Sequence, residues 1–187
     1  MIGPRFPVVL KAAAGGDGDA FGMLWCDLQP RLLRYFRVAA GGAGEDLASE
    51  TWLRVVRGIG RFHGNEPAFR AWVFTIARHQ VLDWRRRAAR TPTQDLPVVG
   101  LAEPAASDDP AAAAVEGAST RAALALIATL PADQAEAIAL RVVAGLEVSR
   151  VAEVMGKRPG TVRVLTHRGL RRLAERLGAD ARVRRVG

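Results

Sequence analysis

The strongest constraint on the fold is a helical repeat of apolar side chains in residues 45–62. Five of them recur at intervals of four or three residues: Ala48, Trp52, Val55, Ile59 and Phe62. Because an α-helix has 3.6 residues per turn, this spacing places all five on one face. Such a face is stable only when it is buried, so the pattern predicts a helix over 45–61 that packs against other helices.

Two further helices are predicted on either side of this one. The first extends from a cap at Asp17 or Asp19 to about Val38 and is followed by glycines that break the chain. Its apolar stripe comprises Phe21, Leu24, Leu28, Leu32 and Tyr35. The second covers residues 66–90, with Asn65 as its N-cap. The first dozen residues carry little signal and are interpreted as a loose arm.

The helix over 66–90 combines aromatic rings with positive charge. Trp72, Phe74 and Trp84 fall partly off its apolar face. The rest of its surface carries a run of arginines, namely Arg78, Arg85, Arg86, Arg87 and Arg90. Aromatic rings can stack on unpaired bases, and arginines can bind the phosphates beside them. This combination therefore suits the binding of a single nucleic-acid strand. A core helix with a solvated basic end is the alternative, and the residues alone leave both open.

Charge divides the chain into two basic modules and an acidic spacer. Residues 61–90 carry seven arginines and two acids, whereas residues 91–120 carry five acids and no base. From residue 157 to the end there are ten bases and two acids, and the whole chain has a net charge of +8. This balance indicates an anionic partner, either nucleic acid or a membrane surface. Residues 91–117 also have the proline, alanine and acid content of a linker.

The second basic module has the pattern of a helix-turn-helix. Three short helices are predicted, with apolar stripes of Leu124, Ile127 and Leu130, then Ala135, Ile138, Ala139 and Val142, then Val148, Val151, Ala152 and Met155. Pro131 is expected to open the second of them, and Gly156 to end the third with a left-handed cap. A final basic helix follows over 161–177, with Val162, Leu165, Leu170 and Leu173 on its apolar side. A generic helical hairpin with a basic exterior is the alternative.

Several classes of protein are not favoured. The longest apolar runs fall well short of the roughly 20 residues that cross a bilayer, so membrane insertion is not expected and the chain is expected to be cytoplasmic. Cys26 is the only cysteine, which excludes an intrachain disulfide, and it is interpreted as a small buried filler. His63, His79 and His167 have no metal-ligand spacing. No cofactor, metal site or enzymatic activity is expected.

Three motifs in order carry a family resemblance. They are DLASETWLRVVRGIGRF (46–62), FRAWVFTIARHQVLDWRRR (69–87) and GL-x8-MGKRPGTVR (145–163). They resemble the extracytoplasmic function (ECF) group of bacterial sigma-70 factors. The resemblance implies an all-α fold of two small helical domains joined by an acidic flexible linker. The implied division is an N-terminal arm (1–16), sigma region 2 (17–90), the linker (91–117), sigma region 4 (118–177) and a basic tail (178–187).

The resemblance also implies a function and its partners. Such a factor binds core RNA polymerase at the β′ clamp helices and the β flap, and is often held by an anti-sigma protein. Region 2 recognises and melts the −10 element as a single strand, and region 4 reads the −35 element as a duplex. A stand-alone helix-turn-helix regulator of duplex DNA is the alternative. A nucleic-acid-processing enzyme is a third, but the sequence offers no convergent acid or metal cluster for it.

The resemblance also implies site residues, at the positions of this sequence that match the motifs of the family. The implied core-binding surface is Asp46, Leu47, Glu50, Leu53, Arg54 and Arg57, although a solvated charged face is the ordinary interpretation of such a pattern. The implied −10 contacts are His63, Gly64, Asn65, Glu66, Arg70, Trp72, Thr75, Arg78, His79, Arg85 and Arg86. The implied −35 contacts are Arg158, Thr161, Arg163, Val164, His167, Arg168, Arg171 and Arg172. Gly169 replaces a common alanine, which predicts a loss of about 0.5–1 kcal/mol of helix stability.

Overall fold

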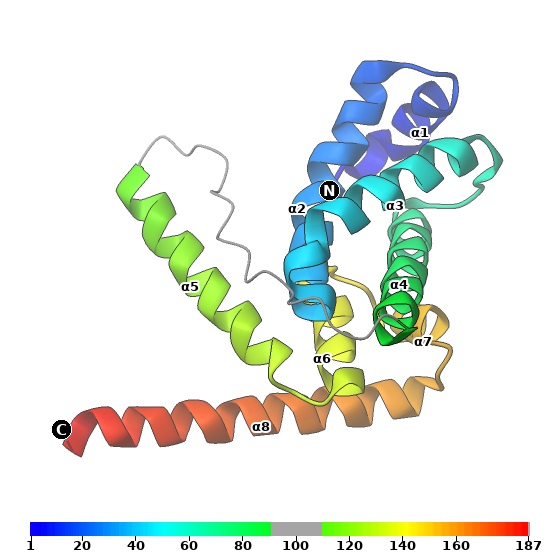
Figure 1. The fold of residues 1–187 in the computed structure, drawn as a ribbon. Helices are drawn as coiled ribbons and strands as arrows, with labels where there is room; N and C mark the ends of the chain where they lie inside the picture. The colour runs from blue at the N-terminus through cyan, green and yellow to red at the C-terminus, as the bar shows by residue number, and fades with distance from the viewer. Residues whose placement is uncertain (91–109, 187) are drawn as a thin grey trace.

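The structure is a computed structural model that describes the backbone of residues 1–90 and 110–186 and the side chains of residues 1–90 and 117–178. Every regular element in these stretches is helical, which confirms the all-α prediction. We call residues 1–90 the N-terminal domain and residues 110–186 the C-terminal domain. Figure 1 shows helices α2, α3 and α4 grouped together, with α6 and α7 against them and α8 lying across the end.

The N-terminal domain contains four helices. They are α1 (Phe6–Ala14), α2 (Gly18–Ala40), α3 (Gly44–Gly58) and α4 (Glu66–Arg90), with short 3-10 turns at Gly3–Arg5, Gly41–Ala43 and Ile59–Arg61. The three predicted helices are therefore confirmed within a few residues. Both predicted caps form, because Asp17 Oδ1 accepts from the Ala20 N–H at 2.9 Å and Asn65 Oδ1 accepts from the Ala68 N–H at 3.0 Å.

The apolar stripes of these helices meet in one core. Most side chains of the predicted stripes are buried, namely Leu24, Leu28, Leu32, Tyr35, Ala48, Trp52, Val55 and Ile59, whereas Phe21 and Phe62 are half-buried. Phe69 and Val73 of α4 are buried in the same core. Phe74 departs from its prediction, because it is fully buried and its ring meets that of Tyr35 edge to face at 5.5 Å. Phe74 is therefore a core residue and is not available for stacking on a base.

The first dozen residues form a packed helix and not a loose arm. Phe6, Val9 and Ala13 of α1 are buried against α2, and the Phe6 ring lies 5.6 Å from that of Phe69. Two turns of helix give too short a period to stand out in the sequence. The order of α1 therefore comes from tertiary packing, against the neighbouring α2 and against Phe69 of α4.

The C-terminal domain is built from α5 (Pro110–Ala128), α6 (Ala132–Ile138), a π-helical turn (Ala139–Val143), α7 (Val148–Met155) and α8 (Pro159–Val186). The segment predicted as a linker therefore ends at a helix that begins at Pro110, and its residues 91–109 lie outside the described part. Pro131 is the N-cap of α6, one residue before its predicted place. Helix α8 continues through most of the predicted tail.

The predicted helix-turn-helix is present. Gly156 adopts φ +64°, the left-handed cap expected at the end of α7, and the Lys157 N–H then donates to Ala152 O at 2.9 Å. Two members of the predicted stripes are exposed, Val142 by 63% and Leu170 by 48%. The π-helical turn explains Val142, because an extra residue in one turn rotates the following side chains. In α8 the buried line passes through Gly169, so its neighbour Leu170 faces outward.

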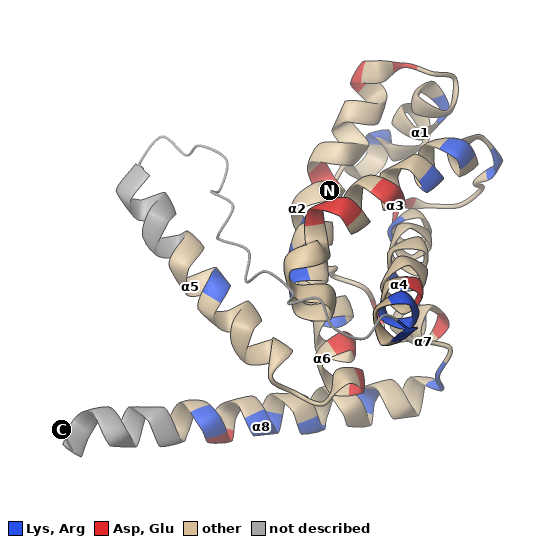
Figure 2. Cartoon of the chain, viewed as in Figure 1, with Lys and Arg blue, Asp and Glu red and all other residues tan. Residues whose placement is uncertain are grey.

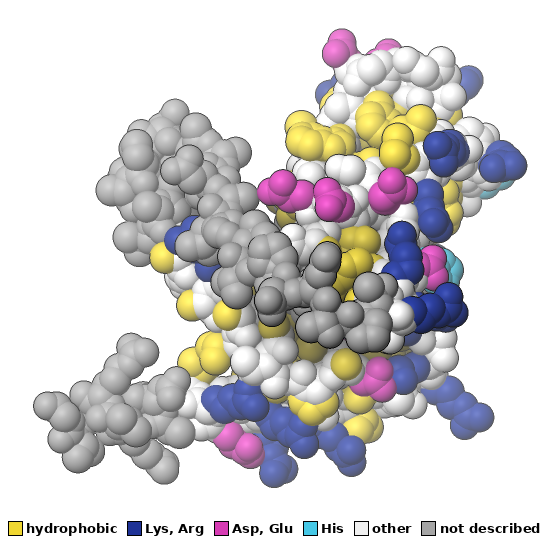
Figure 3. Space-filling model, viewed as in Figure 1, with side chains coloured by type: hydrophobic (Ala, Val, Ile, Leu, Met, Phe, Trp, Pro, Cys, Tyr) yellow, Lys and Arg dark blue, Asp and Glu magenta, His cyan; other side chains and the backbone are white. Residues whose placement is uncertain are grey.

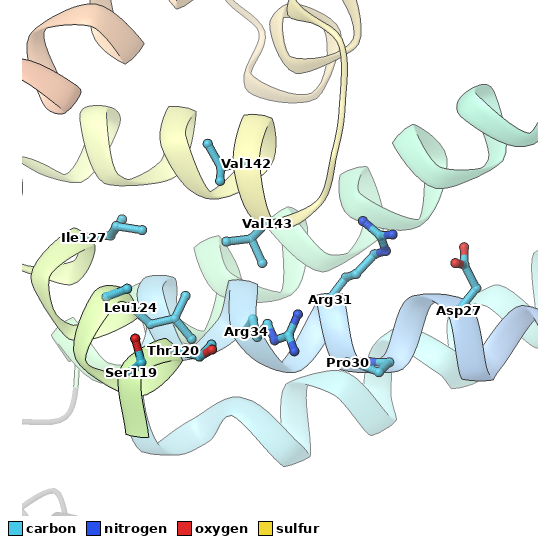
Figure 4. A pocket seen from close by; sticks show the side chains of 11 residues that line it. Asp27, Pro30, Arg31, Arg34, Ser119, Thr120, Leu124, Ile127, Val142 and Val143 are labelled. Atoms are coloured by element: carbon cyan, nitrogen blue, oxygen red, sulfur yellow. The ribbon is translucent and has the colours of Figure 1, made fainter. Parts of the chain in front are cut away.

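The two domains pack against each other. Helix α2 contacts α5, α6 and the π-helical turn, and α4 contacts α7. Their buried apolar side chains form one continuous cluster. A cavity of about 560 Å³ lies beside this contact, lined by Arg31 and Arg34 of α2 and by α5 and Val143 of the other domain (Figure 4).

Candidate polymerase and promoter-DNA surfaces

The outer face of α3 is exposed and charged. Acids lie in its first half and arginines in its second, as Figure 2 shows, which suits the positive and negative ends of the helix dipole. Of the predicted core-binding residues, Asp46, Glu50, Leu53, Arg54 and Arg57 are exposed.

Two corrections apply to this α3 face. Leu47 is only 4% exposed and belongs to the core, because α3 packs against both α2 and α4 and so buries more than a single stripe. Val56 was not predicted, yet it is 54% exposed beside Leu53 at 49%. An apolar pair three residues apart on a charged face was the signal that could have identified it.

The loop before α4 divides into an open and a covered part. His63, Gly64 and Asn65 are exposed. Glu66 is half-buried, and its carboxylate accepts from the backbone N–H groups of Ile2 at 3.0 Å and Gly3 at 2.9 Å. Glu66 therefore fastens the N-terminal turn to α4 in this structure.

Arg70 is buried, which contradicts its prediction as a DNA contact. It is 6% exposed, and its Nη2 lies 3.4 Å from both Asp27 Oδ2 and Glu66 Oε1. Burial raises the pKa of the Asp27 carboxyl, but the Met1 amino group at 2.8 Å, with Arg70 and Arg31, outweighs burial and leaves that pKa below its usual value. This cluster holds the N-terminus, α2 and α4 together.

One face of α4 stays accessible. Trp72, Thr75, His79 and Arg86 follow one another at intervals of three, four and seven residues, and all are half-buried or exposed. The Trp72 ring lies 5.2 Å from that of Phe62 and 5.6 Å from that of Phe69. Trp72 therefore offers one ring face from a rigid aromatic cluster, which suits base stacking.

The remaining arginines of α4 differ in their surroundings. Arg85 is exposed and donates to the Ala39 carbonyl at 2.7 Å, and Arg86 lies 3.2 Å from Asp83 on its own helix. Arg78 is half-buried, and its Nε lies 3.0 Å from Glu136 Oε1 of the C-terminal domain. The structure thus brings Arg78 to the domain contact and leaves Arg85 and Arg86 on the surface.

Helix α8 presents a basic face. The predicted −35 contacts are all exposed: Arg158, Thr161, Arg163, Val164, His167, Arg168, Arg171 and Arg172. Arg171 pairs with Glu175 at 2.9 Å, and Arg172 donates to Gln134 Oε1 at 3.3 Å. Figure 2 shows basic residues along this helix, and Figure 3 shows basic side chains gathered there on the side away from the N-terminal domain.

Gly169 has a packing role that cannot be inferred from its low helix propensity. A Cβ added there would lie 2.6 Å from Ile138 Cδ1 and 3.4 Å from Gln134 Cβ and Leu130 Cδ1. Glycine therefore allows α8 to approach α6 closely. A glycine that is unfavourable for the isolated helix is thus favourable for the packing of α8 on α6.

Other predictions concern single residues and absences. Cys26 is exposed, which contradicts its interpretation as a buried filler, because it lies off the α2 stripe between Leu24 and Leu28.

Among residues with described side chains, histidine, cysteine, aspartate and glutamate form no group of three that could hold a metal. None of the described helices is long and apolar enough to cross a membrane.

Comparison with known families matches both domains. Residues 27–91 match the family described as Sigma-70 region 2, and residues 120–173 match the family described as Sigma-70, region 4. These two stretches hold the α3 and α4 surfaces and the helix-turn-helix described above.

Whole-chain relatives define the group within this family. The chain is 35% identical over 180 residues to the ECF RNA polymerase sigma factor BldN of Streptomyces coelicolor, covering 95% of this chain and 68% of that protein. It is 32% identical over 188 residues to the ECF RNA polymerase sigma factor SigD of Mycobacterium tuberculosis, covering 96% and 87%. The chain belongs to the ECF sigma factors of the sigma-70 family.

Solved structures share the fold. The structure of CnrH in complex with the cytosolic domain of CnrY matches with a TM-score of 0.63 at 24% identity, covering 92% of this chain and 97% of that one. The sigma factor RpoE in complex with the anti-sigma factor NepR from Bartonella quintana matches with a TM-score of 0.64 at 22% identity, covering 86% and 98%.

Proposed function

We propose that this ECF sigma factor binds core RNA polymerase through the exposed face of α3 and carries it to promoters with α4 and α8. The observation that carries the proposal is the α3 face itself. Leu53 and Val56 are about half exposed there, and Glu50, Arg54 and Arg57 surround them. An apolar centre with a charged rim is the usual anatomy of a protein interface.

Helix α8 is the proposed −35 reader. It follows the helix-turn-helix turn at Gly156, and its outer face carries Arg163, His167 and Arg168 without cover from the other domain. The second helix of this motif enters the major groove, where arginine makes bidentate bonds to guanine. Val164 and Thr161 lie on the same face and suit apolar contact with thymine methyl groups.

Helix α4 and the loop before it form the proposed −10 site. Trp72 supplies a stacking surface, and exposed His63, Asn65 and His79 supply polar groups for base edges. Unpairing and unstacking a base costs a few kcal/mol, which such a surface offsets. Arg85 and Arg86 are proposed to hold the strand backbone. This function needs no active site in the chain.

A protein inhibitor is also proposed as a partner. The RpoE neighbour was solved in complex with the anti-sigma factor NepR. Two basic DNA-binding surfaces in one chain make an acidic protein a suitable competitor for both. The stand-alone regulator receives no support from a specific observation, since it leaves the α3 face without a use.

The experiment that tests the proposal is co-elution with sigma-free bacterial core polymerase on size exclusion. The wild type should co-elute, and the double variant Glu50→Lys with Arg54→Glu should not. The matched control is Arg150→Glu with Glu153→Lys, which reverses an exposed ion pair on α7, and it should co-elute. A wild type that binds duplex DNA but never joins core would overturn the proposal.

A further inference from the structure

The two domains meet at a partly buried polar contact. Glu136 of α6 accepts from Arg78 Nε at 3.0 Å and from the Tyr35 hydroxyl at 3.3 Å. The side chains of Arg78 and Glu136 are only 19% and 14% exposed, and Tyr35 is fully buried. Burial and the neighbouring Glu136 carboxylate raise the pKa of Tyr35 well above its usual value. A single carboxylate of the C-terminal domain thus bridges α2 and α4.

The contact belongs to a larger interface. Gly145 adopts φ +69°, and a Cβ there would lie 3.2 Å from Arg31 Nη1 and 3.7 Å from Arg70 Nη1. The turn before α7 therefore presses its backbone against two arginines of the N-terminal domain. The next residue, Leu146, is 2% exposed and belongs to the cluster that spans both domains. The bridge at Glu136 is flanked by close packing.

Arg78 differs from Arg70, Arg85 and Arg86 of the same helix in the domain that supplies its partner. Arg70, Arg85 and Arg86 bond to groups of the N-terminal domain, whereas the partner of Arg78 comes from the C-terminal domain. A carboxylate oxygen on a guanidinium Nε makes the same charge-assisted bond that a phosphate oxygen makes. Glu136 therefore bonds to Arg78 in the same way as a phosphate group of a DNA strand would.

We propose that in the free protein the C-terminal domain covers part of the −10 surface, with Glu136 occupying the place of a single-strand phosphate on Arg78. The inference rests on the proposed function of α4 as the −10 site. The two DNA surfaces then differ in the closed chain. Helix α8 faces solvent and can bind duplex, whereas the −10 strand must displace Glu136 before it reaches Arg78.

Only open molecules can bind the strand at Arg78. The apparent affinity for a single strand is therefore the affinity of the open form multiplied by the fraction of molecules that are open. A partner that holds the two domains apart removes this loss and exposes Arg78 at the same time. The cavity beside the interface, lined by Arg31 and Arg34 in Figure 4, leaves part of the contact unfilled. A partly filled interface suits a contact that must open.

The first test compares single-strand binding by full-length variants. The probe is a fluorescein-labelled, mixed-sequence, single-stranded 20-nucleotide DNA, and the readout is fluorescence anisotropy. Glu136→Gln should raise affinity about tenfold, as expected when a mostly closed population opens. The control Asp133→Asn removes the same charge from an exposed position on the same helix and should change affinity far less. Equal gains in both variants would mean that only net charge matters, and the proposal would fall.

A double variant asks whether the gain passes through Arg78. Adding Arg78→Gln to Glu136→Gln should abolish the increase in single-strand affinity. Small-angle X-ray scattering should give a larger radius of gyration for Glu136→Gln at unchanged helical circular dichroism. A gain that survives without Arg78, or a radius that does not change, would contradict closure through this pair.

A third measurement needs no substitution. Tyr35 is the only tyrosine, so 3-fluorotyrosine labelling of the wild type gives a single ¹⁹F resonance at the bridge. The single-stranded probe should shift this resonance, because it displaces Glu136 from Tyr35 and Arg78 together. A self-complementary duplex bound through α8 should leave it in place. A resonance unmoved by saturating single strand would overturn the inference, while core co-elution would still decide the proposed function separately.

Discussion

The indole ring of Trp72 lies against Gly58, so closely that a Cβ on Gly58 would come within 2.8 Å of Trp72 Cζ2. Gly58 is the last residue of α3, and Trp72 lies on the accessible face of α4. The proposed polymerase-binding helix therefore supports the proposed stacking residue directly. Glycine is needed at this point for space, since its φ does not lie in the left-handed region.

Gly58→Ala is expected to displace Trp72 and impair promoter opening. The clash falls on the far end of a half-exposed ring, which can swing away without unfolding the domain. One base stack is worth about 1–3 kcal/mol, so opening should fall on the order of tenfold while core binding is kept. Permanganate reactivity of −10 thymines measures the opening. Gly60→Ala is the control, because a Cβ there meets nothing within 4 Å, and equal reactivity in both variants would contradict the role of Trp72.

Gly169→Ala is expected to destabilise the C-terminal domain. The new methyl group would meet Ile138 Cδ1 at 2.6 Å, and Ile138 is 1% exposed and cannot leave the core. Overpacking costs about 1–3 kcal/mol, and the better helix propensity of alanine returns up to about 1 kcal/mol. Urea unfolding followed by circular dichroism should therefore show a net loss of stability.

Two variants control the Gly169 experiment. Gly178→Ala lies on the same helix in open space and should stabilise it slightly. Adding Ile138→Val to Gly169→Ala removes the clashing methyl group and should recover part of the lost stability. If Gly169→Ala alone proves as stable as Gly178→Ala, the close approach of α8 and α6 does not constrain this position.

Local physical chemistry was sufficient to predict most of the helices. The α3 stripe from Ala48 to Ile59 is buried as its period requires, and Asp17, Asn65 and Gly156 form the expected caps. Each of these features depends on neighbours within one or two turns of the chain. The exposed arginines of α8 were also predictable, because a helix that follows a helix-turn-helix turn has its buried side fixed by the preceding helix.

Features set by distant partners were not predictable. Arg70 pairs with Asp27, 43 residues away, and Arg78 pairs with Glu136, 58 residues away, so the local pattern shows neither of these partners. Only the Glu66 partner of Arg70, four residues away on the same helix, lies within the local pattern. Leu47 is buried because α3 touches helices on two sides. The π-helical turn that exposes Val142 has no clear local signal either. The sequence could therefore propose both DNA surfaces but not the contact between the domains.

Asp27→Asn is expected to destabilise the N-terminal domain at neutral pH. The carboxylate bonds to the Met1 amino group and to buried Arg70, and hydrogen bonds to charged groups contribute about 1.5–3 kcal/mol. The folded-state pKa of Asp27 lies below the usual value of 3.8, so this stability is present above that pH and is lost as the pH falls below it.

Urea unfolding at a series of pH values measures the contribution of Asp27. The difference between wild type and Asp27→Asn should be largest near neutral pH and should shrink below about pH 3.8, as the wild-type carboxylate becomes protonated. Asp19→Asn, at an exposed position in the first turn of α2, is the control and should show a small difference. A difference for Asp27→Asn that stays constant down to pH 2 would assign the effect to shape and not to charge.

Val56→Asp is expected to weaken core polymerase binding without harming the fold. Val56 is 54% exposed on the α3 face beside Leu53, so aspartate is tolerated in the free protein. A buried carboxylate at the centre of an interface loses its hydration, and loss of a central contact costs 2 kcal/mol or more, roughly 30-fold in affinity. Val8→Asp is the matched control, since Val8 is 73% exposed on α1. Titration of labelled variants with core polymerase should separate the two, and equal affinities would move the polymerase-binding surface away from the middle of α3.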